Sequence, residues 1–192
     1  MYNLFILIFS LIGLMNVMIG DVWAEMDIPF SPIPNSKVYR RIMSWREIRD
    51  EGIVKQKYDY SCGSGALATL MNIGFDEMVS EEEIIELILK DKYPHEIEEI
   101  RTKGYSLLEL KKVAEEKGYK TAMVRLQLNQ LRQLHGPVLI YFEPDGKRHF
   151  SVLKEVKGDR VYLADPAKGN IRLGIYLFKK EWQGVVLAID KK

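Results

Sequence analysis

The chain contains one cysteine, Cys62, at the point where an irregular loop meets a run of small and apolar residues, 63 to 70, that is typical of a buried helix. The start of a helix presents unpaired backbone N–H groups and the positive end of the helix dipole, which favour the nucleophilic thiolate form of cysteine. A free cysteine is also common as a small buried apolar residue. The nucleophile hypothesis therefore requires a partner that accepts and returns a proton.

Three histidines, His95, His135 and His149, are candidates for that partner, and their sequence contexts separate them. His95 follows a proline in a charged segment, and His135 precedes a Gly-Pro pair, so we expect both to be solvated loop residues. His149 begins the apolar segment 150 to 153, which predicts a polar residue at the edge of a core strand. His149 is the preferred partner, although a surface role for it stays open on this evidence.

A carboxylate that orients the histidine is predicted from the expected strand pairing. If residues 157 and 158 form the two-residue turn of a hairpin, His149 lies opposite Pro166. Asp165 is one residue from that partner, and a small register shift, a bulge or the strand twist would bring its carboxylate to the imidazole. An ordinary Asp-Pro turn is the alternative explanation for Asp165.

Together these residues predict covalent catalysis by a thiol. Cys62 would attack a carbonyl carbon, His149 would act as general base and acid, and Asp165 would hold the histidine tautomer. Gln56 lies six residues before the cysteine and can offer its side-chain amide, beside the backbone N–H of Cys62, to a developing oxyanion. The predicted catalytic set is therefore Cys62, His149, Asp165 and Gln56.

The elements that must position these residues differ between the two halves of the chain. Capping residues Ser44, Ser80 and Ser106 predict helices in the first half, and Gly118 ends the last of them. The second half predicts strands joined by turns, at residues 119 to 126, 137 to 142, 150 to 156, 161 to 164 and 184 to 189. We expect an α+β domain in which a helical N-terminal half packs on a C-terminal antiparallel sheet.

The N-terminal region predicts export. Residues 4 to 19 are almost entirely apolar and precede a Val-Trp-Ala cleavage site, so residues 1 to 24 are interpreted as a signal peptide or, through residues 4 to 20, an uncleaved membrane anchor. Residues 25 to 43 contain three prolines and predict an extended linker or strap before a domain at 44 to 192. We expect the domain in the periplasm or otherwise outside the cytoplasm, and possible attachment to the inner membrane stays open.

Composition excludes several other functions. The 28 basic and 27 acidic residues are mixed along the chain and give a net charge of +1, which argues against nucleic acid as a partner. One cysteine and three scattered histidines lack the spacing of zinc ligands. We expect neither a metal nor a cofactor.

Three motifs resemble those of the bacteriocin-processing peptidases that remove double-glycine leader peptides, family thirty-nine of the cysteine peptidases. They are Gln56 through Cys62-Gly63, the His-Phe-Ser-Val-Leu segment at 149 to 153, and the Leu-Ala-Asp-Pro segment at 163 to 166. The order and spacing of the motifs agree, and the resemblance runs from about residue 54 to residue 189. It implies a papain-like fold, a triad of Cys62, His149 and Asp165, and Gln56 in the oxyanion hole.

One departure concerns the substrate, because this chain has Ser61 where transporter-fused members of the family have aspartate. The pattern is closer to stand-alone exported members, some of which accompany systems that secrete proteins, including functional amyloid subunits. The resemblance thus implies a cysteine endopeptidase acting on an exported protein or leader peptide. A catalytically silent, chaperone-like peptide-binding module and an acyltransferase or transglutaminase using the same triad are the alternatives.

Overall fold

The computed structural model describes residues 28 to 29, 39 to 40 and 42 to 191, and it divides the chain into two units, Met1–Ser44 and Trp45–Lys192. In the first unit, β1 (Ile28–Pro29) and β2 (Tyr39–Arg40) pair antiparallel within the segment predicted as a linker. The segment predicted as a signal peptide or anchor lies outside the described residues. None of the helices in the described ranges is both long and apolar enough to cross a membrane.

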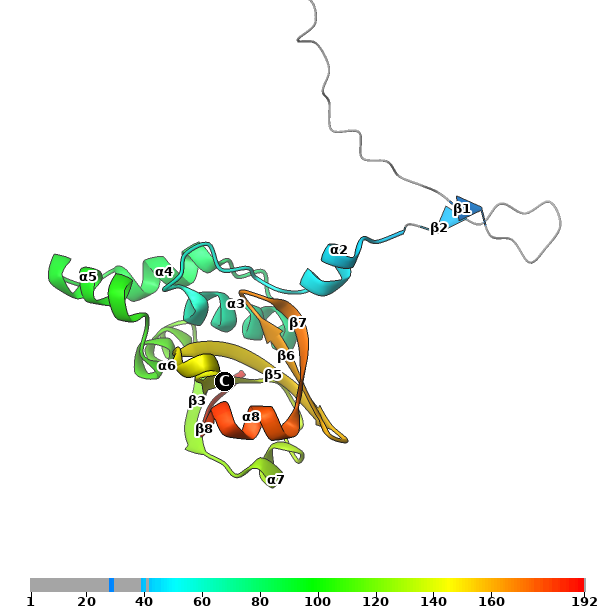
Figure 1. Ribbon diagram of the computed structural model, residues 1–192. Coiled ribbons are helices and arrows are strands. Elements are labelled where there is room, and N and C mark those ends of the chain that lie inside the picture. Colours follow the sequence, from blue (N-terminus) through cyan, green and yellow to red (C-terminus); the bar gives the residue numbers. More distant parts are fainter. Residues whose placement is uncertain (1–27, 30–38, 41, 192) are drawn as a thin grey trace, which may run out of the picture. The chain divides into compact units, whose positions relative to one another are not determined.

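The second unit begins with helices, as its capping residues predict (Figure 1). Ser80 Oγ accepts the Glu83 backbone N–H, and Ser106 and Glu109 bond to each other's backbone N–H groups. The helices are α2 (Trp45–Asp50), α3 (Cys62–Phe75), α4 (Glu81–Leu89), α5 (Pro94–Lys103) and α6 (Leu107–Glu116).

Helix α5 corrects the expectation of a charged loop around His95. Pro94 is the first helical residue, where its missing N–H has no helical partner to lose. Glu96 Oε2 accepts the Tyr93 backbone N–H at 2.8 Å and completes the N-terminal cap. Proline was interpreted as a loop signal, but at this position it starts a helix.

The six-stranded sheet is antiparallel throughout, with the order β3-β8-β4-β5-β6-β7. Five of its strands match the predicted segments, whereas β7 was not predicted. The strands are β3 (Tyr119–Arg125), β4 (Val138–Phe142), β5 (His149–Lys157), β6 (Arg160–Asp165), β7 (Gly169–Gly174) and β8 (Trp182–Lys191). Two short helices, α7 (Leu128–Leu131) and α8 (Ile175–Glu181), and a 3₁₀ turn, η1 (Pro144–Gly146), connect them.

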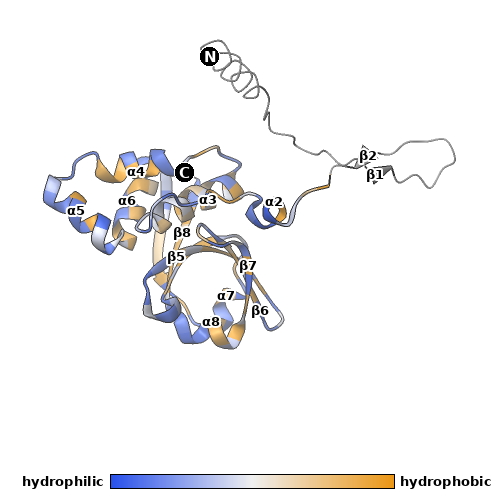
Figure 2. Cartoon of the chain, turned by 45° about the horizontal axis from the view of Figure 1, so that its top comes forward, coloured by the Kyte–Doolittle hydropathy of each residue, from blue (hydrophilic) through white to orange (hydrophobic). Residues whose placement is uncertain are grey.

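The sheet has a hydrophobic core on each face, because successive side chains of a strand point in opposite directions. Leu139 of β4 packs into the core that contains α3, α4 and α6, whereas its neighbour Ile140 packs into the core that contains Phe178 of α8. Figure 2 shows the curved sheet with α3 to α6 on one side and α7 and α8 on the other. The predicted packing of a helical half on an antiparallel sheet is confirmed.

Candidate active site

Helix α3 begins at Cys62, and its first turn packs unusually close to its neighbours. A Cβ atom on Gly63 would lie 3.0 Å from the side chains of Leu110 and Tyr105. A Cβ atom on Gly65 would lie 2.9 Å from Pro166 Cβ and 3.0 Å from a backbone carbonyl oxygen. Close packing accounts for these glycines, and it leaves Cys62 buried, with 7% of its surface exposed.

The loop before Cys62 is held by Glu81, a carboxylate that sequence reasoning did not assign to the site. Glu81 is 1% exposed, and both of its oxygens accept the Lys57 backbone N–H at 3.1 Å. Ser61 Oγ donates to Glu81 Oε1 at 2.6 Å instead of capping α3. In the sequence Glu81 looks like an ordinary acidic residue of the first turn of α4, because it directly follows the capping Ser80 and precedes two further glutamates. No sequence pattern distinguishes it from those two.

His149 and Asp165 meet through their side chains, as the hypothesis requires. His149 Nε2 lies 2.8 Å from Asp165 Oδ2, and the aspartate side chain is only 1% exposed. The other carboxylate oxygen, Oδ1, accepts the backbone N–H groups of Ala167 and Lys168, each at 2.9 Å. Because both oxygens are bonded, the carboxylate is fixed in orientation and holds the imidazole through Nε2.

The predicted hairpin register was wrong in detail. Residues 158 and 159 form the turn, since Lys157 pairs with Arg160, and the register shifts between Leu153 and Glu155. Beyond the shift Val152 pairs with Ala164, so continuing the register places Asp165 opposite Ser151 rather than opposite the neighbour of His149. His149 is two residues from Ser151 along β5, so its contact with Asp165 is a diagonal one across the two strands. An imidazole is long enough to span that diagonal distance.

The pKa values of the pair move in the directions that favour the charged forms. Burial by itself would lower the pKa of His149, but the hydrogen bond to Asp165 and the adjacent Cys62 outweigh burial and raise that pKa to about 9. Burial likewise opposes ionisation of Asp165, yet His149 and the two backbone N–H groups hold the pKa of the carboxyl below its ordinary value. With Nε2 bonded to Asp165, Nδ1 is the nitrogen left to exchange a proton with the thiol.

Gln56 lies on the loop before α3, where its backbone N–H and its side-chain nitrogen each donate a hydrogen bond. Its backbone N–H donates to Pro166 O at 3.1 Å, which ties the loop to the residue after Asp165. Its side-chain Nε2 donates to Tyr58 O at 2.9 Å, and Oε1 is buried with no hydrogen-bond partner among the residues that the structure describes. An amide nitrogen carries two hydrogens, so one N–H bond stays available to an oxyanion.

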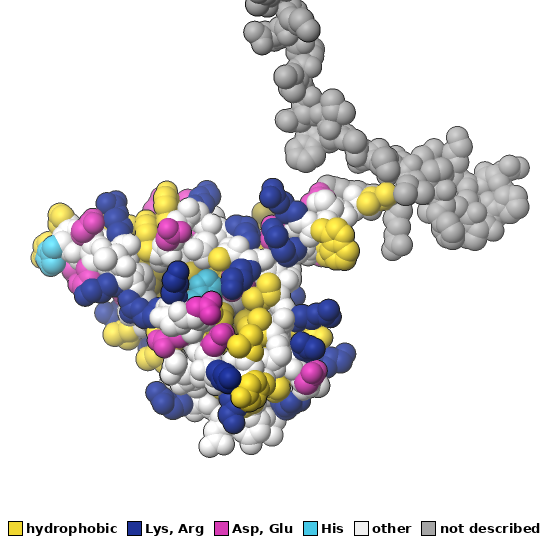
Figure 3. Space-filling view, viewed as in Figure 1, with side chains coloured by type: hydrophobic (Ala, Val, Ile, Leu, Met, Phe, Trp, Pro, Cys, Tyr) yellow, Lys and Arg dark blue, Asp and Glu magenta, His cyan; other side chains and the backbone are white. Residues whose placement is uncertain are grey.

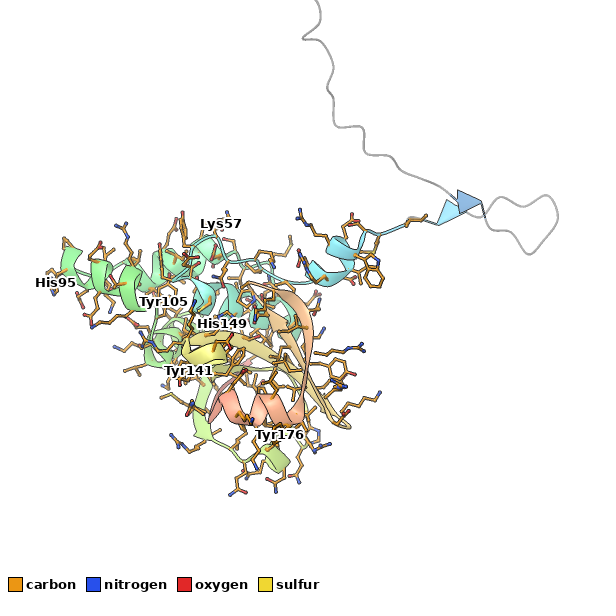
Figure 4. The ribbon with its side chains drawn as sticks, viewed as in Figure 1. Lys57, His95, Tyr105, Tyr141, His149 and Tyr176 are labelled. Carbon is orange, nitrogen blue, oxygen red and sulfur yellow. The ribbon has the colours of Figure 1, made fainter. Side chains whose placement is uncertain are left out.

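A pocket of about 400 Å³ opens beside Cys62. It is lined by the end of α5, the segment before β5 and aromatic side chains of Tyr60, Tyr105 and Phe150. Figure 3 shows Lys and Arg side chains gathered on the face that Figure 4, in the same view, shows around His149. The thiol, although buried, therefore borders an open pocket.

The other histidines take no part in this arrangement. His95 is exposed on α5, at its far end from His149 in Figure 4, and its ring stacks on Tyr93 with the centroids 5.9 Å apart. His135 is exposed in the loop before β4. Within the described ranges, no group of three or more His, Cys, Asp or Glu side chains could hold a metal ion.

A cysteine at the start of a central helix, with a histidine and an aspartate from neighbouring strands of an antiparallel sheet, defines the papain-like class of fold. The chain belongs to the peptidase C39 family of cysteine peptidases, which matches it over residues 50–192. The predicted family and fold are thus confirmed.

Relatives and solved structures agree with that assignment. The chain is 37% identical over 152 residues to a Pseudomonas aeruginosa protein named "Probable functional amyloid protease FapD", covering 79% of this chain and 66% of that protein. It is 32% identical over 177 residues to the protein of the same name from Pseudomonas fluorescens, covering 92% of this chain and 76% of that protein. The chain thus spans just under two thirds of the first relative's length.

Among solved structures, the peptidase domain of Streptococcus ComA has a TM-score of 0.62 at 18% identity, covering 73% of this chain and 98% of that domain. A C39-like peptidase from Bacillus anthracis has a TM-score of 0.54 at 17% identity, covering 72% and 94%. At these identities the similarity shows the fold alone.

Proposed function

We propose that this protein is a cysteine endopeptidase in which Cys62 is the nucleophile, His149 the general acid and base, and Asp165 the residue that orients the histidine. The observation that carries the proposal is the 2.8 Å contact between His149 Nε2 and the buried Asp165 carboxylate, beside a thiol at the first turn of α3. Membership of a peptidase family supports the reaction class.

The reaction proceeds in two steps on this geometry. The Cys62 thiolate forms a bond to the carbonyl carbon of the substrate, and the C–N bond breaks as protonated His149 gives its proton to the leaving amine. His149 then takes a proton from water, the resulting hydroxide attacks the thioester, and the acid product leaves Cys62. Asp165 stabilises the imidazolium that is present before the amine leaves and that forms again when His149 takes a proton from water.

The oxyanion of each tetrahedral intermediate would be stabilised by the Cys62 backbone N–H and the Gln56 side-chain amide. The first N–H groups of a helix have no partner within the helix, so that of Cys62 is available. Gln56 is supported in this role by the bonds that fix both its backbone and its amide nitrogen.

The proposed substrate is an extended, small-residue stretch of an exported protein or of its leader peptide. The names of the Pseudomonas relatives support a functional amyloid subunit or its secretion system as the partner. The apolar residues 4 to 19 support action in the periplasm or otherwise outside the cytoplasm, with membrane attachment through residues 4 to 20 as the alternative to cleavage.

The proposal is tested by incubating the full chain with a degenerate mixture of decapeptides and identifying new termini by mass spectrometry. We expect new termini with the wild type and none with Cys62→Ala, and added hydroxylamine should trap part of the acyl group as a hydroxamate. Cleavage that survives Cys62→Ala would refute the role of the thiol. Binding without cleavage by both proteins would favour the peptide-binding module, and transfer to amines without hydrolysis would favour an acyltransferase.

A further inference from the structure

The pocket beside Cys62 is strongly basic. Arg101 and Lys103 reach it from the last turn of α5, and Lys147 and Arg148 reach it from the segment that leads into β5. Asp59 is the one carboxylate among the residues that line it. Four cations against one anion is an unusual balance in a chain whose net charge is only +1.

Two of the four cations are already paired with carboxylates outside the pocket. Arg101 lies 3.7 Å from Glu98, and Lys103 lies 2.7 Å from Glu99. These pairs are exposed and weak, so each cation can turn toward a second anion.

The other two cations have no carboxylate within ion-pair distance in the part of the chain that the structure describes. Arg148 donates from its guanidinium to the Lys103 backbone carbonyl, and this bond joins the two walls of the pocket. A guanidinium has five N–H bonds, so most of them stay free for a ligand. Lys147 and Arg148 directly precede His149 in the sequence, and both line the pocket together with Cys62.

The floor of the pocket is apolar, because the partly buried Tyr60 and the buried Tyr105 and Phe150 line it together with Cys62. An apolar floor displaces water and strengthens attraction between the cations above it and an anion that enters. It also offers packing to the methylene groups of a side chain such as glutamate.

We propose that this pocket binds an acidic side chain of the substrate, within a few residues of the bond that is cleaved. The inference rests on the proposed function and adds a substrate class to it, namely peptides with aspartate or glutamate beside the scissile bond. Lys147 and Arg148 are the specificity-determining residues, and the aromatic floor holds the stem of the acidic side chain.

The first test compares two alkylating reagents of similar size on the full chain, anionic iodoacetate and neutral iodoacetamide. With either reagent the Cys62 sulfur forms a bond to the methylene carbon and iodide leaves. The rate with iodoacetate is divided by the rate with iodoacetamide, and this ratio is then divided by the same ratio for free cysteine in the same buffer. The resulting normalised ratio reports the charge around the thiol. We expect a ratio above one that falls as salt is added, because the Debye length shrinks to about 3 Å at 1 M.

Substitution locates the source of the attraction. We expect Lys147→Gln and Arg148→Gln each to lower the normalised ratio by roughly threefold at low ionic strength, and Lys147→Glu to lower it further. Lys120→Gln, an exposed lysine on β3 outside the pocket, should leave the ratio unchanged. Using a ratio removes any effect of the substitution on the reactivity of the thiol itself.

The second test asks whether the pocket selects peptides. Two sets of decapeptides with blocked termini are compared, both built from glycine, alanine and serine. In the first set one glutamate occupies each position in turn, and in the second set glutamine replaces that glutamate. We expect the glutamate set to slow early alkylation of Cys62 by iodoacetamide at least threefold more than the glutamine set, and Lys147→Glu to abolish the difference.

The acidic-substrate proposal would be overturned by a normalised ratio at or below one, or by a ratio that Lys147→Glu leaves unchanged. It would also be overturned if the two peptide sets slowed Cys62 alkylation equally or not at all. None of these outcomes bears on whether the thiol is activated. That question is answered by the pH dependence of iodoacetamide alkylation, so failure of the proposed function is distinguishable from failure of the inference.

Discussion

At the scale of single residues, the carboxylate of Asp165 controls the histidine. Its two oxygens serve different partners, with Oδ2 bonded to His149 and Oδ1 bonded to the backbone of Ala167 and Lys168. The turn after β6 thus holds the carboxylate still while the carboxylate holds the imidazole. An aspartate before a proline, which alone suggests a simple turn, here performs both tasks.

Asp165→Asn tests that control. The asparagine keeps the shape but loses the charge, so we expect the pKa of His149 to fall from about 9 toward its ordinary value and turnover to fall on the order of 10²- to 10⁴-fold. NMR titration of the His149 ring and the rate of peptide cleavage measure the two effects. An unchanged histidine titration would contradict the assigned contact.

The pH dependence of stability provides a second residue-scale prediction. Because the pKa of His149 is raised from 6.5 to about 9 on folding, its stabilising contribution is complete below pH 6.5 and is lost as pH rises toward 9. The lowered pKa of Asp165 has the opposite sign, so its contribution is present above pH 3.8 and is lost in acid.

We therefore expect the free energy of unfolding of the wild type to fall between about pH 6.5 and pH 9, measured by urea titration. His149→Gln cannot titrate, so its decline over the same interval should be smaller. Parallel pH profiles for the two proteins would show that the imidazolium does not stabilise the fold.

At the scale of elements, two features place Cys62: the loop held by Glu81 and the glycine-lined first turn of α3. Sequence patterns predicted the helix and its small residues because capping and apolar runs are local signals. They did not predict Glu81, since its partners, the backbone of Lys57 and the hydroxyl of Ser61, lie 24 and 20 positions away along the chain. A contact of this kind exists only after α3 and α4 have packed.

Glu81→Gln tests the loop. Glutamine preserves the volume but replaces one acceptor oxygen by a donor that faces the Lys57 N–H or the Ser61 hydroxyl, so we expect a loss of about 1–3 kcal/mol in the free energy of unfolding. As a positioning residue, Glu81 should affect kcat more than KM. Glu82→Gln is the matched control, because that carboxylate is exposed and should change neither quantity appreciably.

Gly65→Ala tests the close packing of α3. The added Cβ would meet the ring of Pro166 and a backbone oxygen, neither of which can move freely, so we expect a destabilisation of about 1–3 kcal/mol and a loss of activity as the helix shifts away from the strand pair. Gly74→Ala in the same helix meets only Pro137 Cγ at 3.5 Å and should be neutral or stabilising. Equal thermal stability of the two variants would refute the packing argument.

At the scale of the whole molecule, the sequence predicted the fold class, five of six strands and the contact between His149 and Asp165. The prediction succeeded where a signal was local, as with the capping residues, or where the spacing of distant motifs indicated a contact, as with His149 and Asp165. It failed where tertiary contacts decide. Strand β7 begins and ends with glycines that look like turn residues, yet it pairs with β6 along its whole length. Gly169 has a φ of 86°, and a Cβ there would lie 2.7 Å from Arg49 O, so its close approach to α2 accounts for that glycine.

The hairpin between β5 and β6 shows the same limit. The turn was predicted one residue too early, at residues 157 and 158, and the bulge between Leu153 and Glu155 has no local signal. The structure therefore reaches the predicted His149–Asp165 contact through a different register. The pocket walls also come from two segments far apart in the sequence, α5 and the start of β5, which is why its charge was not visible beforehand.

The central claim is that Cys62 and His149 form an activated pair, and the rate of Cys62 alkylation by iodoacetamide from about pH 4 to pH 10 tests it without a substrate. An ordinary thiol reacts with a single rise near pH 8.5. For the wild-type chain we expect a plateau of reactivity that extends well below pH 7 and is lost in His149→Ala. A single rise near pH 8.5 that His149→Ala leaves unchanged would contradict the account.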